Sequence, residues 1–309
     1  MKRIGCFLIC IFNCYYVAAQ GRTSNWYFGY GAGIRFENYS PFFLLDNGID
    51  TIQEGCAAIS KSNGELMYYG SPELAFNRQH DTLHNGAELA GNFSSTQGAL
   101  FIPNPLDTDV VYYVNQLPSH VYSIVRTTES FPLGEILAGE KNILLKDSSS
   151  EKTTAVHHAN GKDIWIILRD NPEDTMLAFL VTENGINPNP VKSALPYGYY
   201  GAQGQLKSSP NGKFLAESTG AQYSWNNHYQ AFLYKFNNAT GVVSETLPIS
   251  DTLLFSYGCE FSANSKYVYF TNYFASISGG IFQYSLENFD STSIQNSRYI
   301  HSVSYGNSM

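Results

Sequence analysis

Charged residues are scarce in this chain of 309 residues: they make up 14% of it, and 18 Lys and Arg face 26 Asp and Glu. No cluster of Lys or Arg occurs after the N-terminal segment. Nucleic acids and anionic membranes are bound chiefly through such clusters, so the net charge of −8 argues against both as partners. Aromatic residues are plentiful by contrast, at 15% of the chain. The chain therefore has enough apolar surface to bury in a sizeable core.

Long hydrophobic runs are also missing, with one exception at the N-terminus. The run Ile4–Val17 is too short to span a membrane, and no later run could do so. It follows two basic residues and ends before Ala18-Ala19, small residues of the kind that precede a cleavage site. We therefore predict a signal peptide over residues 1–20 and a single mature domain over residues 21–309. The mature protein is expected in the periplasm, on the outer surface or outside the cell.

Cysteines are few, and three of the five lie in the predicted signal peptide. Cys56 and Cys259 remain in the mature chain. Export would permit a disulfide between them. We favour two small buried thiols inside strands, because free cysteine is among the most frequently buried residue types.

Motifs for cofactor, metal or nucleophilic chemistry are lacking. The stretch Phe28–Gly33 (FGYGAG) resembles a dinucleotide loop, but no helical pattern follows it, so we interpret it as a glycine-rich edge strand. His157 and His158 are neighbours, and neighbouring side chains of a strand point to opposite faces. A shared metal is therefore not expected there. No Ser-His-Asp order, phosphate loop or zinc spacing is present, and we predict no cofactor and no metal.

A repeated turn is the clearest feature that is present. Short β-rich runs flank a turn that recurs about every 50 residues, as expected for repeat architectures. Asn-Gly accepts the positive φ angles of a tight hairpin, so each turn predicts a β-hairpin. The five turns are Asn63-Gly64, Asp107-Thr108, Asn160-Gly161, Asn211-Gly212 and Asn264-Ser265.

Two further signals recur with the same period. A glycine opens the strand before four of the turns, at Gly55, Gly98, Gly204 and Gly258, whereas the middle unit has Thr153-Thr154 instead. Glycine weakens a strand unless another backbone approaches closely, as at a crowded axis. A second pair of short strands follows each turn hairpin from the second unit onward, so we expect units of four strands.

Four-stranded units at this period predict an all-β fold, a β-propeller with about five visible blades. A β-sandwich also has short strands, but it does not predict three coincident signals. An additional strand region occurs at Trp26–Phe36. Either five blades close through these N-terminal strands, or the ring is incomplete and the chain is truncated.

Several stretches resemble a known group of proteins. They include NWYFGYGAGIRF (Asn25–Phe36), EGCAAISKSNGELMYYG (Glu54–Gly70), SSTQGALFIPNP (Ser94–Pro105) and YGCEFSANSKYVYFT (Tyr257–Thr271). They are similar to the N-terminal WD40-like propeller of secreted Bacteroidetes proteins associated with gliding motility and type IX secretion. The resemblance covers essentially the whole mature chain. It implies an extracellular, non-catalytic propeller, and it indicates no ligand.

The candidate site follows from the repeat. The residues just before the strand-opening glycines are equivalent and should meet at one mouth of the channel. They are Glu54, Gln97, Gln203 and Tyr257, with Glu260 on the same type of inner strand. One or two carboxylates with amides and a phenol favour a ligand-binding mouth over an acid–base pair. The alternative is that these groups only satisfy backbone groups at a crowded axis.

Three functions remain open at this point. The leading hypothesis is an exported, non-catalytic binding or interaction platform for a protein or glycan, in adhesion or assembly at the cell surface or in the secreted fraction. The second is a propeller enzyme of lactonase- or glycosidase-like type. Convergence of Glu54, Glu260 and another acid around one cavity would favour it. The third is a truncated fragment of a larger multidomain surface protein without independent function.

Overall fold

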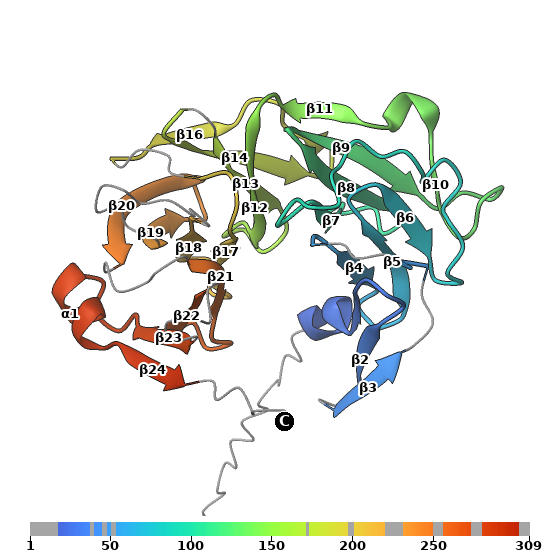
Figure 1. The fold of residues 1–309 in the computed structure, drawn as a ribbon. Coiled ribbons are helices and arrows are strands. Elements are labelled where there is room, and N and C mark those ends of the chain that lie inside the picture. The colour runs from blue at the N-terminus through green and yellow to red at the C-terminus, as the bar shows by residue number, and fades with distance from the viewer. Residues whose placement is uncertain are drawn as a thin grey trace, which may run out of the picture.

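The chain folds into six antiparallel sheets arranged around a central axis (Figure 1). The computed structural model describes residues 18–37, 40–44, 48–50, 54–170, 173–196, 201–219, 231–249, 256–272 and 280–302. The predicted signal peptide lies outside these residues except for 18–20. The sheets follow one another in chain order, and we number them blades 1 to 6. The prediction of an all-β propeller is confirmed.

Blades 1 to 3 are formed by the first half of the chain. Blade 1 has three strands: β1 (Asn25–Tyr27), β2 (Gly33–Glu37) and β3 (Ser40–Leu44). Blade 2 also has three: β4 (Ala57–Ser60), β5 (Leu66–Ser71) and β6 (Leu74–Asn77). Blade 3 has five: β7 (Ala99–Pro103), β8 (Val110–Leu117), β9 (Ser119–Arg126), β10 (Glu135–Ile136) and β11 (Ile143–Lys146).

Blades 4 to 6 follow, and the last two have the predicted four strands. Blade 4 contains β12 (Ser149–His157), β13 (Ile164–Asp170), β14 (Thr175–Thr182), β15 (Gly185–Ile186) and β16 (Val191–Ala194). Blade 5 contains β17 (Leu206–Ser208), β18 (Phe214–Ser218), β19 (Ala231–Asn237) and β20 (Val242–Ile249). Blade 6 contains β21 (Ser256–Phe261), β22 (Tyr267–Asn272), β23 (Gly280–Ser285) and β24 (Tyr299–Ser302).

The number of blades is six, compared with about five expected. The N-terminal strand region does not complete the last blade. Instead β2 turns back and pairs with β3, with Arg35 opposite Phe42, so these strands form a sheet of their own. Tyr27 then stacks on Tyr69 of blade 2 with ring centroids 4.3 Å apart. This contact attaches blade 1 to blade 2. Blade 6 takes its outermost strand, β24, from the end of its own segment and not from the N-terminal strands.

The repeated turns lie between the two inner strands of blades 2 to 6, as predicted. Gly64, Gly161 and Gly212 have φ angles of +88°, +71° and +69°, and Ser265 takes the same region at +58°. The asparagine of each Asn turn acts through its side chain. In blade 5, for example, Asn211 Oδ1 accepts a hydrogen bond of 3.0 Å from the amide of Lys213. The lysine that follows the turn thus contributes its backbone to this contact.

Two of the four glycines that open the inner strands, Gly55 and Gly98, meet a crowded axis, as predicted. A Cβ atom on Gly55 would lie 2.4 Å from the backbone nitrogen of Gly98, which belongs to the next blade. A Cβ atom on Gly98 would lie 2.6 Å from Cγ of Pro72. Because no side chain could fit there, glycine lets neighbouring blades approach closely.

The core lies between the blades rather than within one layer. Each boundary from blade 1–2 to blade 5–6 buries a cluster of apolar side chains contributed by both sheets. At the boundary of blades 5 and 6, for instance, Leu233 and Phe270 are fully buried in one cluster. A fully buried side chain of this size contributes about 1.5–3 kcal/mol. These five boundaries are called the closed boundaries below.

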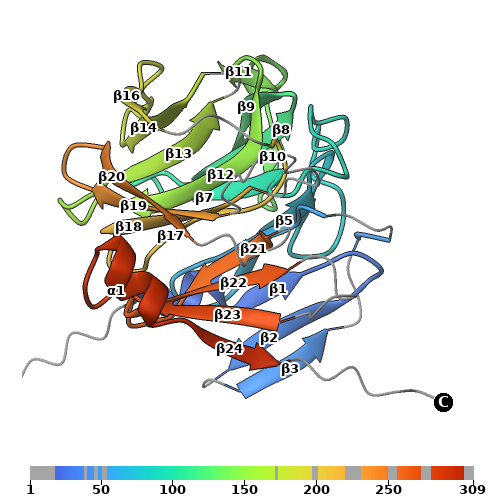
Figure 2. The same ribbon diagram turned by 60° about the vertical axis from the view of Figure 1, so that its left-hand side comes forward.

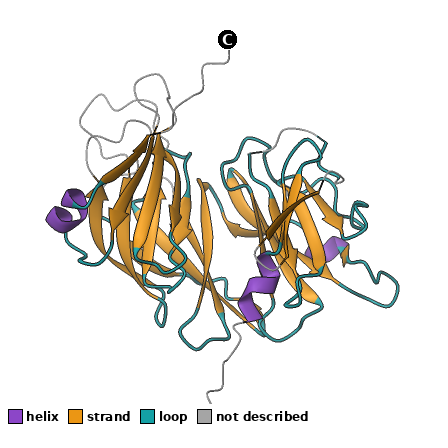
Figure 3. Cartoon of the chain, turned by 90° about the horizontal axis from the view of Figure 1, so that it is seen from below, coloured by secondary structure: helices purple, strands orange, loops and turns teal. Residues whose placement is uncertain are grey.

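Three smaller features complete the fold (Figure 3). The stretch before β24, where a short strand was expected, instead contains the helix α1 (Ser291–Asn296). The helix begins because the side chain of Asp290 accepts a hydrogen bond of 2.9 Å from the amide of Ser293. Two 3-10 helices, Ala18–Thr23 and Ala138–Glu140, are the others in the described residues. None of these helices is long and apolar enough to cross a membrane.

Cys56 and Cys259 are free thiols. Cys259 is buried inside β21, as we favoured from the sequence, whereas Cys56 is half-buried and lies just before β4. Burial raises the pKa of Cys56 to about 11 and that of Cys259 to about 12. Both groups are therefore neutral thiols at physiological pH, with little thiolate available for reaction.

Candidate functional site

A row of polar groups crosses the axis and joins four blades. Tyr257 Oη donates to a carboxylate oxygen of Glu54 at 3.0 Å and lies 2.9 Å from Oγ1 of Thr96. The Thr96 hydroxyl and amide both donate to Glu151 at 2.8 Å. Glu54 precedes β4, Thr96 precedes β7, Glu151 lies in β12 and Tyr257 in β21. The inner strands of blades 2, 3, 4 and 6 are thus connected through side chains.

The tyrosine in this row keeps its proton. Burial raises the pKa of Tyr257 to about 12, and the neighbouring carboxylates of Glu54 and Glu151 act in the same direction. The phenol is therefore a hydrogen-bond donor over the whole physiological pH range, and it is not a general base.

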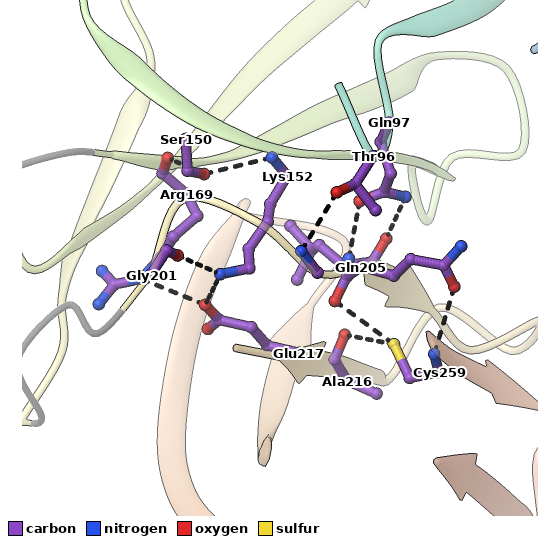
Figure 4. A network of polar contacts seen from close by, with 12 residues as sticks. Thr96, Gln97, Ser150, Lys152, Arg169, Gly201, Gln205, Ala216, Glu217 and Cys259 are labelled. Carbon is purple, nitrogen blue, oxygen red and sulfur yellow. Dashed lines mark hydrogen bonds and ion pairs between the residues drawn. The ribbon is translucent and has the colours of Figure 1, made fainter. Parts of the chain in front are cut away.

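Gln97 performs a backbone role at the axis, which is the structural alternative considered from the sequence (Figure 4). Its Oε1 accepts from the amides of Thr153 and Leu206 at 3.2 and 2.7 Å, and its Nε2 donates to the Leu206 carbonyl at 3.0 Å. The Gln97 side chain thus links blades 3, 4 and 5 by hydrogen bonds to backbone groups, as a neighbouring strand would within a sheet. Gln205, which the sequence reasoning missed, acts similarly and accepts from the amide of Cys259 at 3.2 Å.

The five predicted site residues are only partly brought together. Glu54 and Tyr257 are in direct contact, and Gln97 lies close to them through Thr96, its neighbour in sequence. Glu260 is exposed and forms an ion pair of 3.2 Å with Lys207. Gln203 is exposed and takes no part in these contacts. Gln205, two residues further on, lies at the axis, where Gln203 was predicted.

A second polar network, not foreseen from the sequence, is buried between blades 4 and 5 (Figure 4). Lys152 is 1% exposed, and its ammonium donates to the Gly201 carbonyl at 2.7 Å and lies 3.2 Å from Glu217. Glu217 also accepts a hydrogen bond of 2.5 Å from the Tyr234 hydroxyl, and Arg169 lies 3.7 Å away. Burial lowers the pKa of Lys152, while the charge of Glu217 opposes this effect. The network thus compensates the buried charges of Lys152, Arg169 and Glu217.

The sixth boundary, between blades 6 and 1, differs from the other five (Figures 1 and 2). Among the described residues, no apolar cluster spans these two blades. A cavity of about 550 Å³ lies beside this boundary, among the inner strands. It is lined by residues of β1 and of the segment around β4, by Gln205 and Lys207 of blade 5, and by Glu260 of blade 6. A second cavity of about 590 Å³ lies along blade 6 and shares those three residues. The two cavities together are called the open cleft below.

One wall of the open cleft is the outer face of blade 1. Trp26 pairs with Ile34, which pairs with Phe43, so the three side chains share a face of the sheet. Tyr27 on the opposite face packs against blade 2, and the Trp26 face therefore points away from blade 2. Trp26 is 48% exposed and Phe43 is 81% exposed. This wall is consequently aromatic and uncovered.

The other wall is the outer face of blade 6, which is more polar. Its inner face joins the closed boundary with blade 5 through Phe270 and Phe282. On the outer face, Tyr269 lies in register with Gln283 and Tyr299, and Thr271 with Ile281 and His301. The His301 ring contacts Tyr299 edge-on at 4.7 Å and its Nε2 lies 3.2 Å from Oε1 of Gln283.

Two acid groups lie among the described residues of the open cleft. Glu54 and Glu260 both line the smaller cavity, and no further Asp or Glu of the described segments does so. Glu54 accepts a hydrogen bond from the Tyr257 hydroxyl, and Glu260 is paired with Lys207. In the part of the chain that the structure describes, no group of three His, Cys, Asp or Glu side chains could hold a metal ion. The convergence of three acids that would have favoured an enzyme is thus not found among the described residues of this cavity.

The glycine-rich stretch Phe28–Gly33 and the histidine pair both belong to local turns. The stretch Phe28–Gly33 is mostly the turn between β1 and β2, with left-handed φ angles at Tyr30 and Gly31, and a strand follows it. It is a hairpin turn more than the edge strand that we expected. His158 Nδ1 accepts from the Asn160 amide at 2.9 Å, which fixes a repeat turn.

Fold and cleft together define a β-propeller of six blades with one open boundary. No family model matches the chain, and no curated protein does. The chain is similar in structure to a putative 6-phosphogluconolactonase from Bacteroides uniformis ATCC 8492, with 17% identity and a TM-score of 0.50 over 89% of this chain and 77% of that chain. A protein from Lactobacillus plantarum gives 11% identity and a TM-score of 0.50, over 88% and 76% of the two chains.

A putative 6-phosphogluconolactonase from Bacteroides fragilis NCTC 9343 has 12% identity and a TM-score of 0.48, over 88% and 75%. At these identities the first two structures support the propeller fold and nothing finer. The resemblance to gliding-motility-associated proteins has no matching family model behind it and stays a prediction.

Proposed function

We propose that the chain is a non-catalytic binding platform whose ligand occupies the open cleft. The observation that carries this proposal is the contrast between the closed boundaries and the open one. A soluble protein seldom leaves a continuous group of aromatic side chains uncovered unless the surface binds something. Trp26 and Phe28 are 48% and 41% exposed and line the cavity of about 550 Å³ together. Both cavities fall within the usual volume range of ligand sites.

The experiment that tests this proposal uses one wall of the cleft and a matched control. The mature chain and its Trp26→Ala variant are screened against a glycan array and a panel of purified extracellular-matrix and cell-surface proteins. Trp26→Ala should weaken any specific binding about tenfold or more, as expected for a central aromatic contact. Leu144→Ala changes a side chain that is 61% exposed on the outer edge of blade 3 and should bind normally. Binding that Trp26→Ala leaves unchanged would refute the cleft as the site.

The enzyme hypothesis is a second candidate, favoured by two observations. Glu54 and Glu260 line one cavity, and the similar solved structure from Bacteroides uniformis carries the name of a putative 6-phosphogluconolactonase. Against it, the ammonium of Lys207 is already paired with Glu260, so no described cation in this cavity is left to receive a phosphate. If the chain is such a lactonase, it should hydrolyse 6-phosphogluconolactone, and Glu54→Gln should abolish the activity. Because we favour the non-catalytic platform, we expect the unmodified chain to leave the hydrolysis of 6-phosphogluconolactone at its uncatalysed rate.

The cellular context in the proposal is an exported protein in adhesion or assembly at the cell surface or in the secreted fraction. It is supported by the signal-peptide pattern of residues 1–20. N-terminal sequencing of the mature protein from fractionated cells should find a start next to Gln20. The hypothesis that the chain is part of a larger multidomain surface protein stays a prediction.

A further inference from the structure

We propose that the ligand of the open cleft is a neutral oligosaccharide, an inference that rests on the proposed function. The two walls differ in chemistry in a way that selects among ligands. The blade 1 wall offers flat aromatic rings, whereas the blade 6 wall offers hydroxyl, amide and imidazole groups. A pyranose ring has the matching asymmetry, since its C–H face is apolar and its equatorial rim carries hydroxyls.

The aromatic wall is built to hold a ring face. The Trp26 side chain is held by two contacts: its Nε1 donates to the Thr23 carbonyl at 2.9 Å, and its ring meets Phe36 edge-on at 5.2 Å. Its indole is nevertheless 48% exposed. A rigid, partly exposed indole provides a large contact area at little cost in conformational entropy.

The opposite wall would have to be more apolar if it served only to pack against another sheet. At the closed boundary between blades 4 and 5, the corresponding face of blade 4 presents Trp165, Ile167 and Met176. At the open boundary, the face of blade 6 presents Tyr269, Gln283 and His301 with one exposed aliphatic residue, Ile281. Groups that can each donate or accept hydrogen bonds replace the aliphatic side chains, so this face suits a partner rich in hydroxyls.

The charge of the cleft favours a neutral ligand. Lys207 and Glu260 neutralise one another, and Glu54 carries the remaining formal charge among the lining residues. The carboxylates of Glu54 and Glu260 and the net charge of −8 disfavour polyanions such as uronate chains. Carboxylates are also good acceptors for paired sugar hydroxyls.

The shape of the cleft favours a chain of sugars over a monosaccharide. The two cavities, of about 550 and 590 Å³, are adjacent, because both are lined by Gln205, Lys207 and Glu260. Either cavity alone is large enough for a small ligand. A single ligand that contacts both Trp26 and Tyr269 must therefore be long enough to reach past these three residues.

The test uses intrinsic fluorescence and calorimetry with defined probes. The probes are hexasaccharides of β-1,4-glucan, β-1,4-xylan, α-1,4-glucan and α-mannan, with hexagalacturonate and chitosan hexamer as charged counterparts. At least one neutral hexamer should bind and shift the Trp26 emission, and its monosaccharide should bind far more weakly. Trp26→Ala and Tyr269→Ala should each weaken binding about tenfold, whereas Leu144→Ala should not change it. Tyr269→Phe should retain part of the affinity.

Three results would overturn the inference in distinguishable ways. If no neutral hexasaccharide binds at about 10 mM, a concentration that would reveal even a millimolar affinity, the ligand class is wrong. If instead a protein partner or a second copy of the chain shields Trp26, as measured by acrylamide quenching and light scattering, the sugar fails and the cleft as a binding site stands. If a hexasaccharide binds with unchanged affinity to both Trp26→Ala and Tyr269→Ala, the proposed function fails as well.

Discussion

The closed boundaries and the open boundary of this propeller are built from the same kind of sheet. The faces at the closed boundaries are buried in apolar clusters, whereas the faces at the open boundary are exposed. Blade 6 shows both on one sheet. Phe282 is 5% exposed in the cluster shared with blade 5, whereas its neighbour Ile281 is 36% exposed and lines the open cleft. Alternation along a strand places these residues on opposite faces. The comparison shows that a single blade carries both kinds of surface, with a core face on one side of the sheet and an exposed, more polar face on the other.

The largest expected effect comes from the closed face of blade 6. Phe270→Ala removes a fully buried ring and should lower the free energy of unfolding by about 3–5 kcal/mol. Ile281→Ala, one strand away on the open face, should cost within about 1 kcal/mol. Urea denaturation of both variants measures the difference. Equal losses would mean that the open face is packed as tightly as the closed one.

A comparable effect is expected at the buried charges between blades 4 and 5. Glu217→Ala leaves Lys152 and Arg169 without their buried carboxylate and should cost about 3–5 kcal/mol. The double variant Lys152→Met with Glu217→Leu removes both members of one ion pair and should recover part of this loss. A double variant less stable than Glu217→Ala would show that the Lys152 ammonium stabilises the fold even without its carboxylate partner.

The closed boundary of blades 3 and 4 should be sensitive to acid. His120 in β9 is fully buried, its Nδ1 lies 2.5 Å from Oγ of Ser149 in β12, and burial lowers its pKa to about 3. In the unfolded chain the imidazole takes up a proton near its ordinary pKa of about 6.5. The unfolded state therefore binds more protons between these values, so this contribution to stability is complete above pH 6.5 and falls as pH drops toward 3.

At pH 5 the expected loss from His120 is about 2 kcal/mol, because the unfolded pKa lies about 1.5 units higher. His120→Gln should remove this part of the pH dependence, as measured by denaturation between pH 5 and 8. Stability that falls equally in the variant would assign the acid sensitivity to other groups.

The smallest effect is expected in the polar row at the axis. Tyr257→Phe removes the hydroxyl that donates a hydrogen bond to Glu54, and a hydrogen bond of this kind contributes about 1 kcal/mol. Because Glu54 is exposed, its carboxylate can be rehydrated, and the loss should not exceed this value. Thermal denaturation measures this loss. A loss of stability several times larger than about 1 kcal/mol would show that the polar row holds the blades together.

The sequence was informative wherever a structural need is local. Asn-Gly turns could be predicted because φ above zero and the asparagine side chain act within a few residues, as at Asn211. The close approach of neighbouring blades at Gly55 and Gly98 could be predicted because the repeat placed both glycines at one axis. Blade 1 could not be counted as a blade from the sequence, because no Asn-Gly turn marks it and the period of the repeat does not predict the pairing of β2 with β3.

The site depended on contacts between distant residues, and the sequence indicated less of it. The repeat correctly placed Glu54 near Tyr257, which are far apart in the chain. It could not show that Lys207 neutralises Glu260, or that Lys152 and Glu217 meet inside the protein, because each pair comes from different blades. It also could not show that the outer faces of blades 1 and 6 stay uncovered, since uncovered faces and core faces alternate in the same way along a strand.

Hydroxyl-radical footprinting of the purified mature chain tests the central contrast most directly. The reagent modifies side chains that water reaches, so Trp26, Phe43 and Tyr299 on the open cleft should be labelled rapidly. Tyr113, Phe179 and Phe270 at the closed boundaries should be protected until the protein unfolds. If Trp26 and Tyr299 were as protected as Phe179 in the monomer, the boundary between blades 6 and 1 would be closed, and the account of an open binding cleft would be contradicted.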